Sequence, residues 1–147
     1  MITTNNLNEA RKQIQELKKK NEKVVVLAHD EKFNRKIFES KDVDMVCELE
    51  FHGKDKIKQR DSGLNEILCK LAKENNIEIG INLNKIKSLE KTEKAVVLAR
   101  IIQNINLCKR VGCKLTVIGD YGKQEIMSFF LTFKGNTNQG ITASNFK

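Results

Sequence analysis

Four short apolar segments alternate with segments of helical periodicity, and this alternation constrains the fold more than any other feature of the chain. The apolar segments span residues 23–28, 43–49, 77–83 and 114–119. The first of them is continuously apolar from Val24 to Ala28, as expected for a strand with both faces covered. Strands that alternate with helices form parallel sheets. The sequence therefore predicts an α/β fold with a parallel sheet and flanking helices.

The helices are predicted from the spacing of their apolar residues. They are expected at residues 8–20, 33–38, 91–111 and 122–133, with one or two further turns at 137–143. A central helix is expected to start at the turn Asp61-Ser62-Gly63, with Asp61 or Ser62 capping its first N–H groups. Gly112 is well placed to end the longest helix, because glycine readily adopts the left-handed conformation found there.

The same spacing predicts which side of two helices is buried. In the central helix the expected face carries Leu64, Ile67, Leu68, Leu71 and Ala72. In the longest helix it carries Ala95, Leu98, Ala99, Ile102 and Ile105, with Val96, Val97 and Ile101 widening it. Residues 84–90 are expected to be a polar connection, and residues 1–6 are expected to be frayed.

The size and composition predict a single domain over residues 1–147. A hydrophobic fraction of 39% in a chain of 147 residues is sufficient for one core. No apolar run approaches the ~18–20 residues that a membrane-spanning helix needs, and nothing near residue 1 resembles a signal peptide. The expected location is the cytoplasm, with no membrane partner.

The charge balance favours a polyanionic partner. Lysine and arginine outnumber aspartate and glutamate by 27 to 19, which gives a net charge of +8. The alternative is a lysine- and asparagine-rich compositional bias with no functional content. Charge alone does not decide between them.

Four cations concentrated just before the central helix form the best candidate site. Lys54, Lys56, Lys58 and Arg60 alternate along a segment of seven residues, where they could follow a phosphate backbone. Ser62 and Gly63, at the expected helix start, could offer N–H groups to the same phosphate. With one tyrosine and no tryptophan, recognition is expected to depend on RNA shape and backbone. The alternative is a solvated lysine loop.

The ends of the predicted strands carry a second, weaker candidate. A metal-dependent phosphoesterase would use His29, Glu50, His52 and Asp120, which all follow strands. Two histidines are few for a multi-metal site and no His-x-His pair occurs, so solvated loop residues are the favoured interpretation. The four cysteines have no Cys-x-x-Cys spacing and are expected to be buried, reduced thiols. No catalytic residue and no metal ligand is therefore predicted.

The segment around the central helix also carries a resemblance. The run from Arg60 to Asn65, followed by residues 68–83, resembles the archaeal ribonuclease P protein component 3 family, which is related to the PHP-type TIM barrels. Glu66 stands where that family often has His, and Cys69 where it often has Ala. The family-like region runs over residues 24–146, and residues 1–20 form a divergent N-terminal helix. Because family members begin with additional strands and helices, the resemblance implies a partial, N-terminally shortened TIM-barrel-like fold.

The resemblance also implies a function. It implies a protein subunit of ribonuclease P, which removes the 5′ leader from precursor tRNA through a catalytic centre made of RNA. Such a chain is not catalytic alone and binds no cofactor, and Mg²⁺ is expected with the RNA. The implied partners are ribonuclease P RNA, precursor tRNA, a small RRM-like protein subunit and other ribonuclease P proteins. The alternatives are a metal-dependent PHP-type phosphoesterase and a degenerate scaffold protein of this fold.

Overall fold

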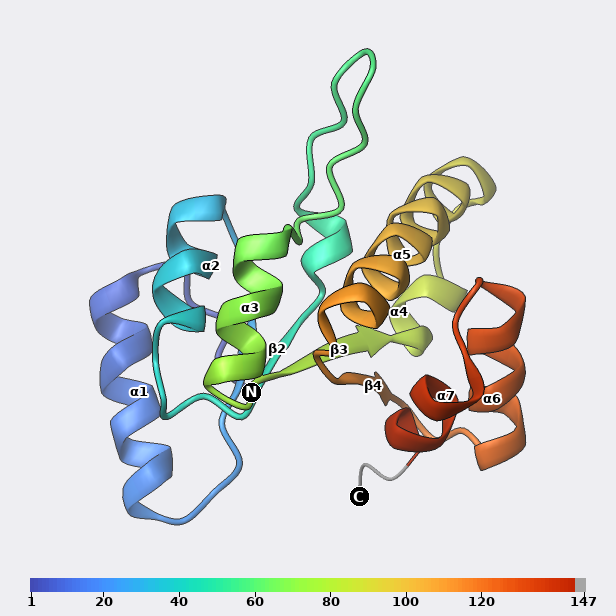
Figure 1. The fold of residues 1–147 in the computed structure, drawn as a ribbon. Helices are drawn as coiled ribbons and strands as arrows, with labels where there is room; N and C mark the ends of the chain where they lie inside the picture. Colours follow the sequence, from blue (N-terminus) through green and yellow to red (C-terminus); the bar gives the residue numbers. More distant parts are fainter. Residues whose placement is uncertain (145–147) are drawn as a thin grey trace.

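A four-stranded parallel sheet forms the centre of the molecule (Figure 1). The computed structural model describes residues 1–144, so Phe146, which ends the family-like region, lies outside the described residues. The strands are β1 (Val25–Leu27), β2 (Met45–Cys47), β3 (Glu78–Asn82) and β4 (Leu115–Ile118), and they pair in chain order. The predicted α/β class is confirmed.

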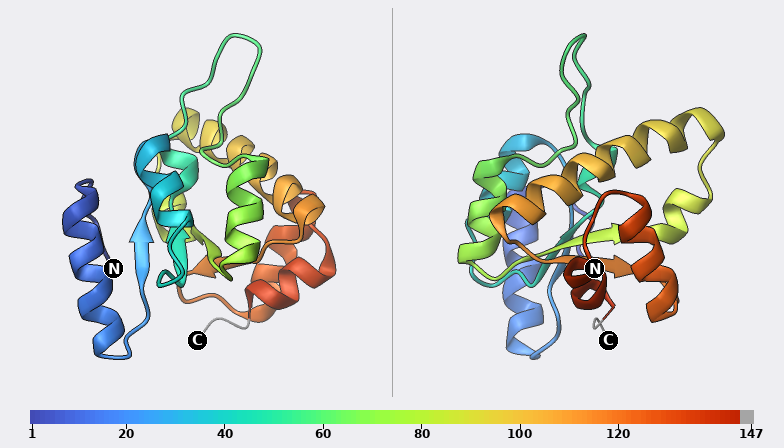
Figure 2. Two further views of the ribbon diagram at one scale, coloured as in Figure 1. Left: turned by 60° about the vertical axis from the view of Figure 1, so that its left-hand side comes forward. Right: turned by 45° about the vertical axis from the view of Figure 1, so that its right-hand side comes forward.

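Helices connect successive strands and flank the sheet (Figures 1 and 2). They are α1 (Leu7–Lys19), α2 (Glu31–Phe38), α3 (Glu66–Glu74), α4 (Leu83–Lys87), α5 (Lys91–Val111), α6 (Lys123–Thr132) and α7 (Thr137–Ala143). A short 3₁₀ helix, η1 (Leu49–Phe51), follows β2. None of the helices in residues 1–144 has the length and apolar content that crossing a membrane requires.

The two faces of the sheet are covered to different degrees. Alternate strand residues such as Val26, Val46 and Ile79 are buried in the main core, where α3 packs against α2 and α5. Figure 1 shows α3 and α5 in front of the sheet. On the opposite face Val25 and Ile118 remain half-buried. The main core therefore lies between the sheet and the α2–α3–α5 layer.

The predicted start of the central helix is wrong by about one turn. Helix α3 begins at Glu66, and Asn65 is its N-cap, with a side chain that accepts a hydrogen bond from the backbone N–H of Leu68 at 2.9 Å. Asp61 is engaged with loop N–H groups instead, so it cannot cap the helix. The buried face of α3 also differs from the predicted one: Leu68, Cys69 and Ala72 are buried, whereas Ile67 is 60% exposed.

The predicted bounds of the longest helix are confirmed, but its buried face is displaced. Helix α5 ends at Gly112, which has a φ of 81° in the left-handed region. The buried residues of α5 are Val97, Ile101, Asn104, Ile105 and Cys108. Ala95, by contrast, is exposed. Apolar residues occur almost all round this helix, so the sequence alone does not mark one buried face.

Two segments expected to lack structure have it. Ile2 forms a parallel bridge to Val26 and is only 2% exposed, so the N-terminal residues are not frayed. The predicted polar connection after β3 contains α4, which Asn82 caps by accepting from the backbone N–H of Lys85 at 3.1 Å. Ile86 anchors α4 in the core. A five-residue helix with two apolar residues, Leu83 and Ile86, is too short to show a helical period in the sequence.

Candidate nucleic-acid interface

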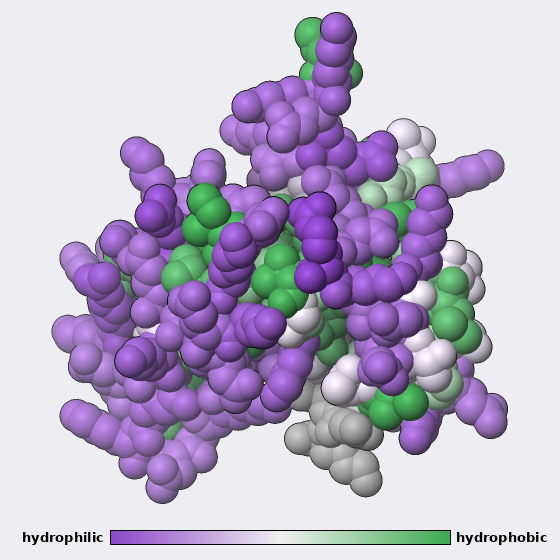
Figure 3. All heavy atoms as spheres, viewed as in Figure 1, coloured by the Kyte–Doolittle hydropathy of each residue, from purple (hydrophilic) through white to green (hydrophobic). Residues whose placement is uncertain are grey.

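The segment between η1 and α3 projects from the body of the molecule (Figure 1). We call residues 52–65 the basic loop. Its arms are joined by backbone hydrogen bonds between Lys56 and Gln59, at 2.8 and 3.1 Å, and Ile57 at its tip is fully exposed. The four predicted cations, Lys54, Lys56, Lys58 and Arg60, are all exposed on it. Figure 3 shows the loop as predominantly hydrophilic.

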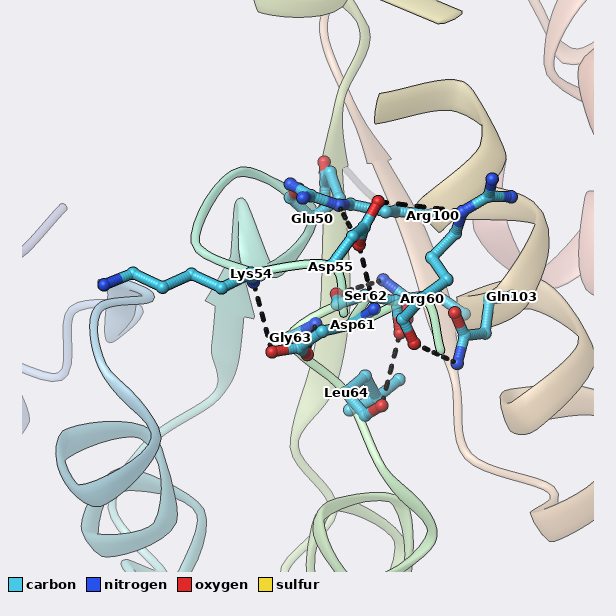
Figure 4. Close-up of polar contacts among 11 residues, drawn as sticks. Glu50, Lys54, Asp55, Arg60, Asp61, Ser62, Gly63, Leu64, Arg100 and Gln103 are labelled. Carbon is cyan, nitrogen blue, oxygen red and sulfur yellow. Dashed lines mark hydrogen bonds and ion pairs between the residues drawn. The ribbon is translucent and has the colours of Figure 1, made fainter. Parts of the chain in front are cut away.

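Arg100 of α5 ties the basic loop to the body of the protein (Figure 4). Its Nη1 donates to the carbonyl oxygen of Glu50 at 3.0 Å, and its Nε lies 3.2 Å from Oδ1 of Asp55. The side chain of Arg100 is only 11% exposed, so solvent screens this ion pair less than it would a surface pair. The sequence alone does not mark Arg100 as a site residue, because its contacts join segments 45 to 50 residues apart.

Two amides of α5 hold the second arm of the loop. Gln103 Nε2 donates to the carbonyl oxygen of Arg60 at 3.4 Å, and Asn104 Nδ2 donates to that of Ser62 at 3.3 Å. Asn104 is buried, and this bond gives its amide nitrogen a partner, whereas its Oδ1 has none among the described residues. Together with Arg100, these amides fix the foot of the loop and leave its tip free.

Carboxylates inside the loop shape its backbone. Asp61 accepts from the backbone N–H of Lys54 at 3.2 Å and of Gly63 at 2.9 Å. Asp55 accepts from the backbone N–H of Asp61 at 2.9 Å. That hydrogen bond, and then Arg100, lower the pKa of Asp55 below its usual value. Both carboxylates are therefore committed to holding the loop conformation.

The lysines of the basic loop remain available to an external anion. Within residues 1–144, no ion pair involves the ammonium groups of Lys54, Lys56 or Lys58. Figure 4 shows the Lys54 side chain directed away from the other labelled residues. Arg60 is shared, because its Nε lies 3.9 Å from Oδ2 of Asp55. Asp55 therefore competes with an external anion for Arg60.

Ser62 and Gly63 do not occupy the helix start at which they were predicted to bind phosphate. Ser62 is fully buried, and its hydroxyl donates to the carbonyl oxygen of Leu64 at 3.2 Å. The N–H of Gly63 already donates to Asp61, as described above. The helix begins beyond them, so neither residue presents a free N–H at a helix N-terminus. Their role in this conformation is to shape the end of the loop.

A groove of about 340 Å³ runs along the foot of the basic loop. Its lining includes Lys56, Arg60 and, from the end of α5, Arg110. Arg110 also pairs with Glu66 at 3.4 Å, with both side chains more than half exposed. Such exposed pairs are weak, so Arg110 can exchange this partner for another anion. The cationic surface therefore extends from the loop toward the end of α5.

The strand-end residues do not assemble into the predicted alternative metal site. The rings of His29 and His52 lie 5.6 Å apart, and partial burial together with His29 lowers the pKa of His52. Asp120 is exposed, and Glu50 is fully buried with Oε1 lacking a hydrogen-bond partner. Among the described residues, these four side chains do not gather closely enough to share one ion.

Glu48, beside this group, is already neutralised within the protein. It accepts from Nδ2 of Asn82 at 2.9 Å and forms an ion pair with Lys85, whose ammonium group lies 4.2 Å from the centre of the Phe51 ring. Glu48 is buried and adopts a positive φ of 65°. A carboxylate with these partners is a poor metal ligand. At this end of the sheet, Glu48 is therefore bound to Asn82 and Lys85 and is not available to a metal ion.

Gly63→Ala is expected to destabilise the protein by at least ~2 kcal/mol. A Cβ at this position would lie 2.1 Å from the backbone oxygen of Leu49, and the φ of +74° is strained for other residues. Urea unfolding would measure the loss. Gly122→Ala is the control, since its Cβ would meet only the end of the Glu125 side chain at 3.3 Å. Equal stability of the two variants would contradict the close packing of Gly63.

Comparison with curated proteins identifies a set of relatives, although no family model matches the sequence. The chain is 29% identical over 109 residues to ribonuclease P protein component 3 of Methanococcus vannielii, and 28% identical over 109 residues to the protein of that name from Methanococcus maripaludis. Each match covers 74% of this chain, but only 45% and 44% of the relatives. The chain thus spans less than half the length of these relatives.

Two solved structures share the fold. One chain of a cryo-EM structure of archaeal ribonuclease P with mature tRNA matches with a TM-score of 0.78 at 19% identity, covering 97% of this chain and 62% of that one. A crystal structure of an uncharacterised protein matches with a TM-score of 0.61 at 13% identity, covering 95% and 35%. These structures establish the fold, and the curated relatives confirm the resemblance to ribonuclease P protein component 3.

Proposed function

We propose that this chain is a protein subunit of ribonuclease P and supports RNA-based removal of the 5′ leader from precursor tRNA. The observation that carries the proposal is the basic loop. Four exposed cations project on a loop whose foot α5 holds at three side chains, in a chain similar to ribonuclease P protein component 3. Function concentrates on loops that a rigid scaffold positions.

In this proposal the protein binds RNA through its backbone. Lysine ammonium groups act as point charges on phosphates, and they position RNA without reading its sequence. Neutralising phosphates lowers their mutual repulsion, which stabilises a compact RNA fold. The RNA holds the Mg²⁺ and performs the cleavage, and the protein contributes no catalytic residue. Ser62 and Gly63 contribute by shaping the end of the basic loop.

The proposed partners follow from the same reading. They are ribonuclease P RNA, precursor tRNA, a small RRM-like protein subunit and other ribonuclease P proteins, in the cytoplasm. The polar face of α3 or an edge of the sheet would contact protein, which leaves the basic loop for RNA. Half-buried apolar residues such as Val25 and Ile118 also lie on the less covered face of the sheet.

Purification of the tagged chain from its native cells tests this function. We expect a structured RNA and small basic proteins to copurify, and the complex to cleave precursor tRNA in Mg²⁺. The isolated protein is expected to leave the same substrate intact. Cleavage by the isolated protein would instead support the phosphoesterase, and recovery of the chain without RNA would support a scaffold.

A further inference from the structure

Three of the four cysteines converge at one buried point. Cys69 lies on α3, Cys108 in the last turn of α5, and Cys113 just before β4. Their Sγ atoms all lie within 4.8 Å of one another, and the residues are 0%, 1% and 7% exposed. Within residues 1–144, no other group of His, Cys, Asp and Glu side chains comes together in this way.

The turn at the end of α5 brings the cysteines together. Gly112 adopts the left-handed conformation and donates its N–H to the carbonyl oxygen of Cys108 at 2.7 Å. This turn reverses the chain, so that Cys113 returns beside Cys108. Packing of α3 on α5 then brings Cys69 to the same point. Four residues separate Cys108 from Cys113, a spacing that zinc sites use, but Cys69 lies 39 positions earlier and no second pair follows, so the sequence alone does not indicate the cluster.

We propose that Cys69, Cys108 and Cys113 form a binding site for one Zn²⁺ ion, held by three thiolates with a fourth position for an exogenous ligand. A Zn–S distance of about 2.3 Å in tetrahedral geometry places the sulfur atoms roughly 3.8 Å apart. From separations of at most 4.8 Å, each sulfur needs to move by less than 1 Å to reach that geometry. Rotation of the side chains alone can supply such a shift.

Cationic side chains near the cluster would offset the negative charge of a zinc–thiolate site. Three thiolates and one Zn²⁺ carry a net charge of −1, which a buried site must offset. Lys73 and Arg110 line the groove beside the cluster, where their charges would offset that of a zinc–thiolate site. A thiolate is the form that binds metal, and binding displaces the remaining thiol protons.

The fourth ligand would enter from the surface that α3 and α5 form beside the cluster. A groove on that surface is lined by Glu66, Lys70, Lys73, Glu74, Arg110 and Val111, and none of the three cysteines lines it. Its volume is about 800 Å³. Three protein ligands with an open position distinguish this arrangement from a closed structural site with four. Lys73 also donates to the carbonyl oxygen of Val111 at 3.0 Å, which fixes it over the end of α5.

Metal titration of the reduced, chelator-treated full-length protein tests the proposal without RNA. We expect one Zn²⁺ per chain in competition with a chromophoric chelator, and we expect Co²⁺ to give thiolate charge-transfer absorption together with intense visible bands. Zn²⁺ should also raise the melting temperature, since it binds the folded chain. Changes outside the first coordination shell cost 10–100-fold in affinity, so Cys113→Ala should cost about 100-fold or more.

Cys47→Ala is the matched control. Cys47 is also buried, but it lies in β2, where its thiol donates to the carbonyl oxygen of Val26 at 3.5 Å. This variant should bind Zn²⁺ as the wild type does. Wild-type protein that gives no Co²⁺ charge-transfer band while its four thiols remain reduced would overturn the site. A disulfide within the cluster under cellular reducing conditions would also overturn it, in favour of a redox pair. Neither result depends on how Cys113→Ala folds.

Discussion

Replacing Lys54, Lys56, Lys58 and Arg60 together by Gln is expected to reduce the salt dependence of RNA binding by about 3 in the slope of log K against log salt. Each phosphate contact contributes roughly 0.7–0.9 to that slope through counterion release. Loss of these four phosphate contacts should also weaken RNA binding by roughly 100-fold near physiological salt. Filter binding or fluorescence anisotropy over a range of KCl concentrations would measure both quantities. Affinity should fall similarly for RNAs of unrelated sequence but similar shape.

A matched variant separates the basic loop from overall charge. Arg11, Lys12, Lys19 and Lys20 are exposed on α1 and its C-cap, so their joint replacement by Gln removes the same charge from another surface. It should change the slope far less. Equal flattening by both variants would mean that RNA responds only to net charge. An unchanged slope in the loop variant, with its circular dichroism intact, would mean that the loop is merely solvated.

Among single replacements in the loop, the sequence predicts the largest effect for Arg60, because a guanidinium can hold a phosphate with two hydrogen bonds. The pairing of Arg60 with Asp55 at 3.9 Å competes with that contact. Asp55 has a second cation, Arg100, at 3.2 Å. It can therefore release Arg60 to a phosphate without losing its own ion pair, and the prediction for Arg60 stands.

Glu50→Gln is expected to make the protein more stable at pH 8 and nearly unchanged at pH 5. Burial, reinforced by the nearby charge of Glu48 and opposed by a backbone hydrogen bond, raises the pKa of Glu50 from 4.5 to about 7. Below pH 4.5 the carboxyl is protonated whether the chain is folded or unfolded. Between pH 4.5 and 7 the folded chain binds the proton more tightly, so stability falls as pH rises. The loss is on the order of 3 kcal/mol, and the neutral amide avoids it.

Urea unfolding at the two pH values measures this difference. Glu74→Gln is the control, because Glu74 is exposed on α3 and its replacement should change stability little at either pH. The gain at pH 8 should appear in Glu50→Gln alone. An equal effect of Glu50→Gln at pH 5 and pH 8 would show that its carboxyl does not titrate in this window, and that Glu50 acts through packing.

The sequence predicted those parts of the fold that depend on local signals. The sequence predicts the strands because short apolar segments lie between turns, and it predicts the end of α5 because Gly112 marks it. The start of α3 was missed because Asp61 is as good a cap as Asn65, and only the loop contacts of Asp61 decide between them. Local sequence signals therefore predict the presence of a helix or strand better than they predict its first or last residue.

The site was predicted in part for a related reason. The four cations of the basic loop were predicted because they lie close together in the sequence, and RNA binding by them stays a prediction. Arg100 and the thiol cluster were missed because they depend on α5 returning to the loop and to α3. Contacts between segments about 40 residues apart carry no periodicity, and only the packed chain reveals them.

The pairing of the strands in chain order has a kinetic consequence. Each new strand joins the one made just before it, as when Val46 pairs with Val26 and then with Ile79. The connections differ in length by no more than about twofold, from the single helix α2 to the segment that contains α4 and α5. Because closure entropy grows only with the logarithm of loop length, the entropy lost stays similar at each step. The sheet can therefore assemble one strand at a time, and its folding rate should depend more on closing the separate loops than on bringing the two ends of the chain together.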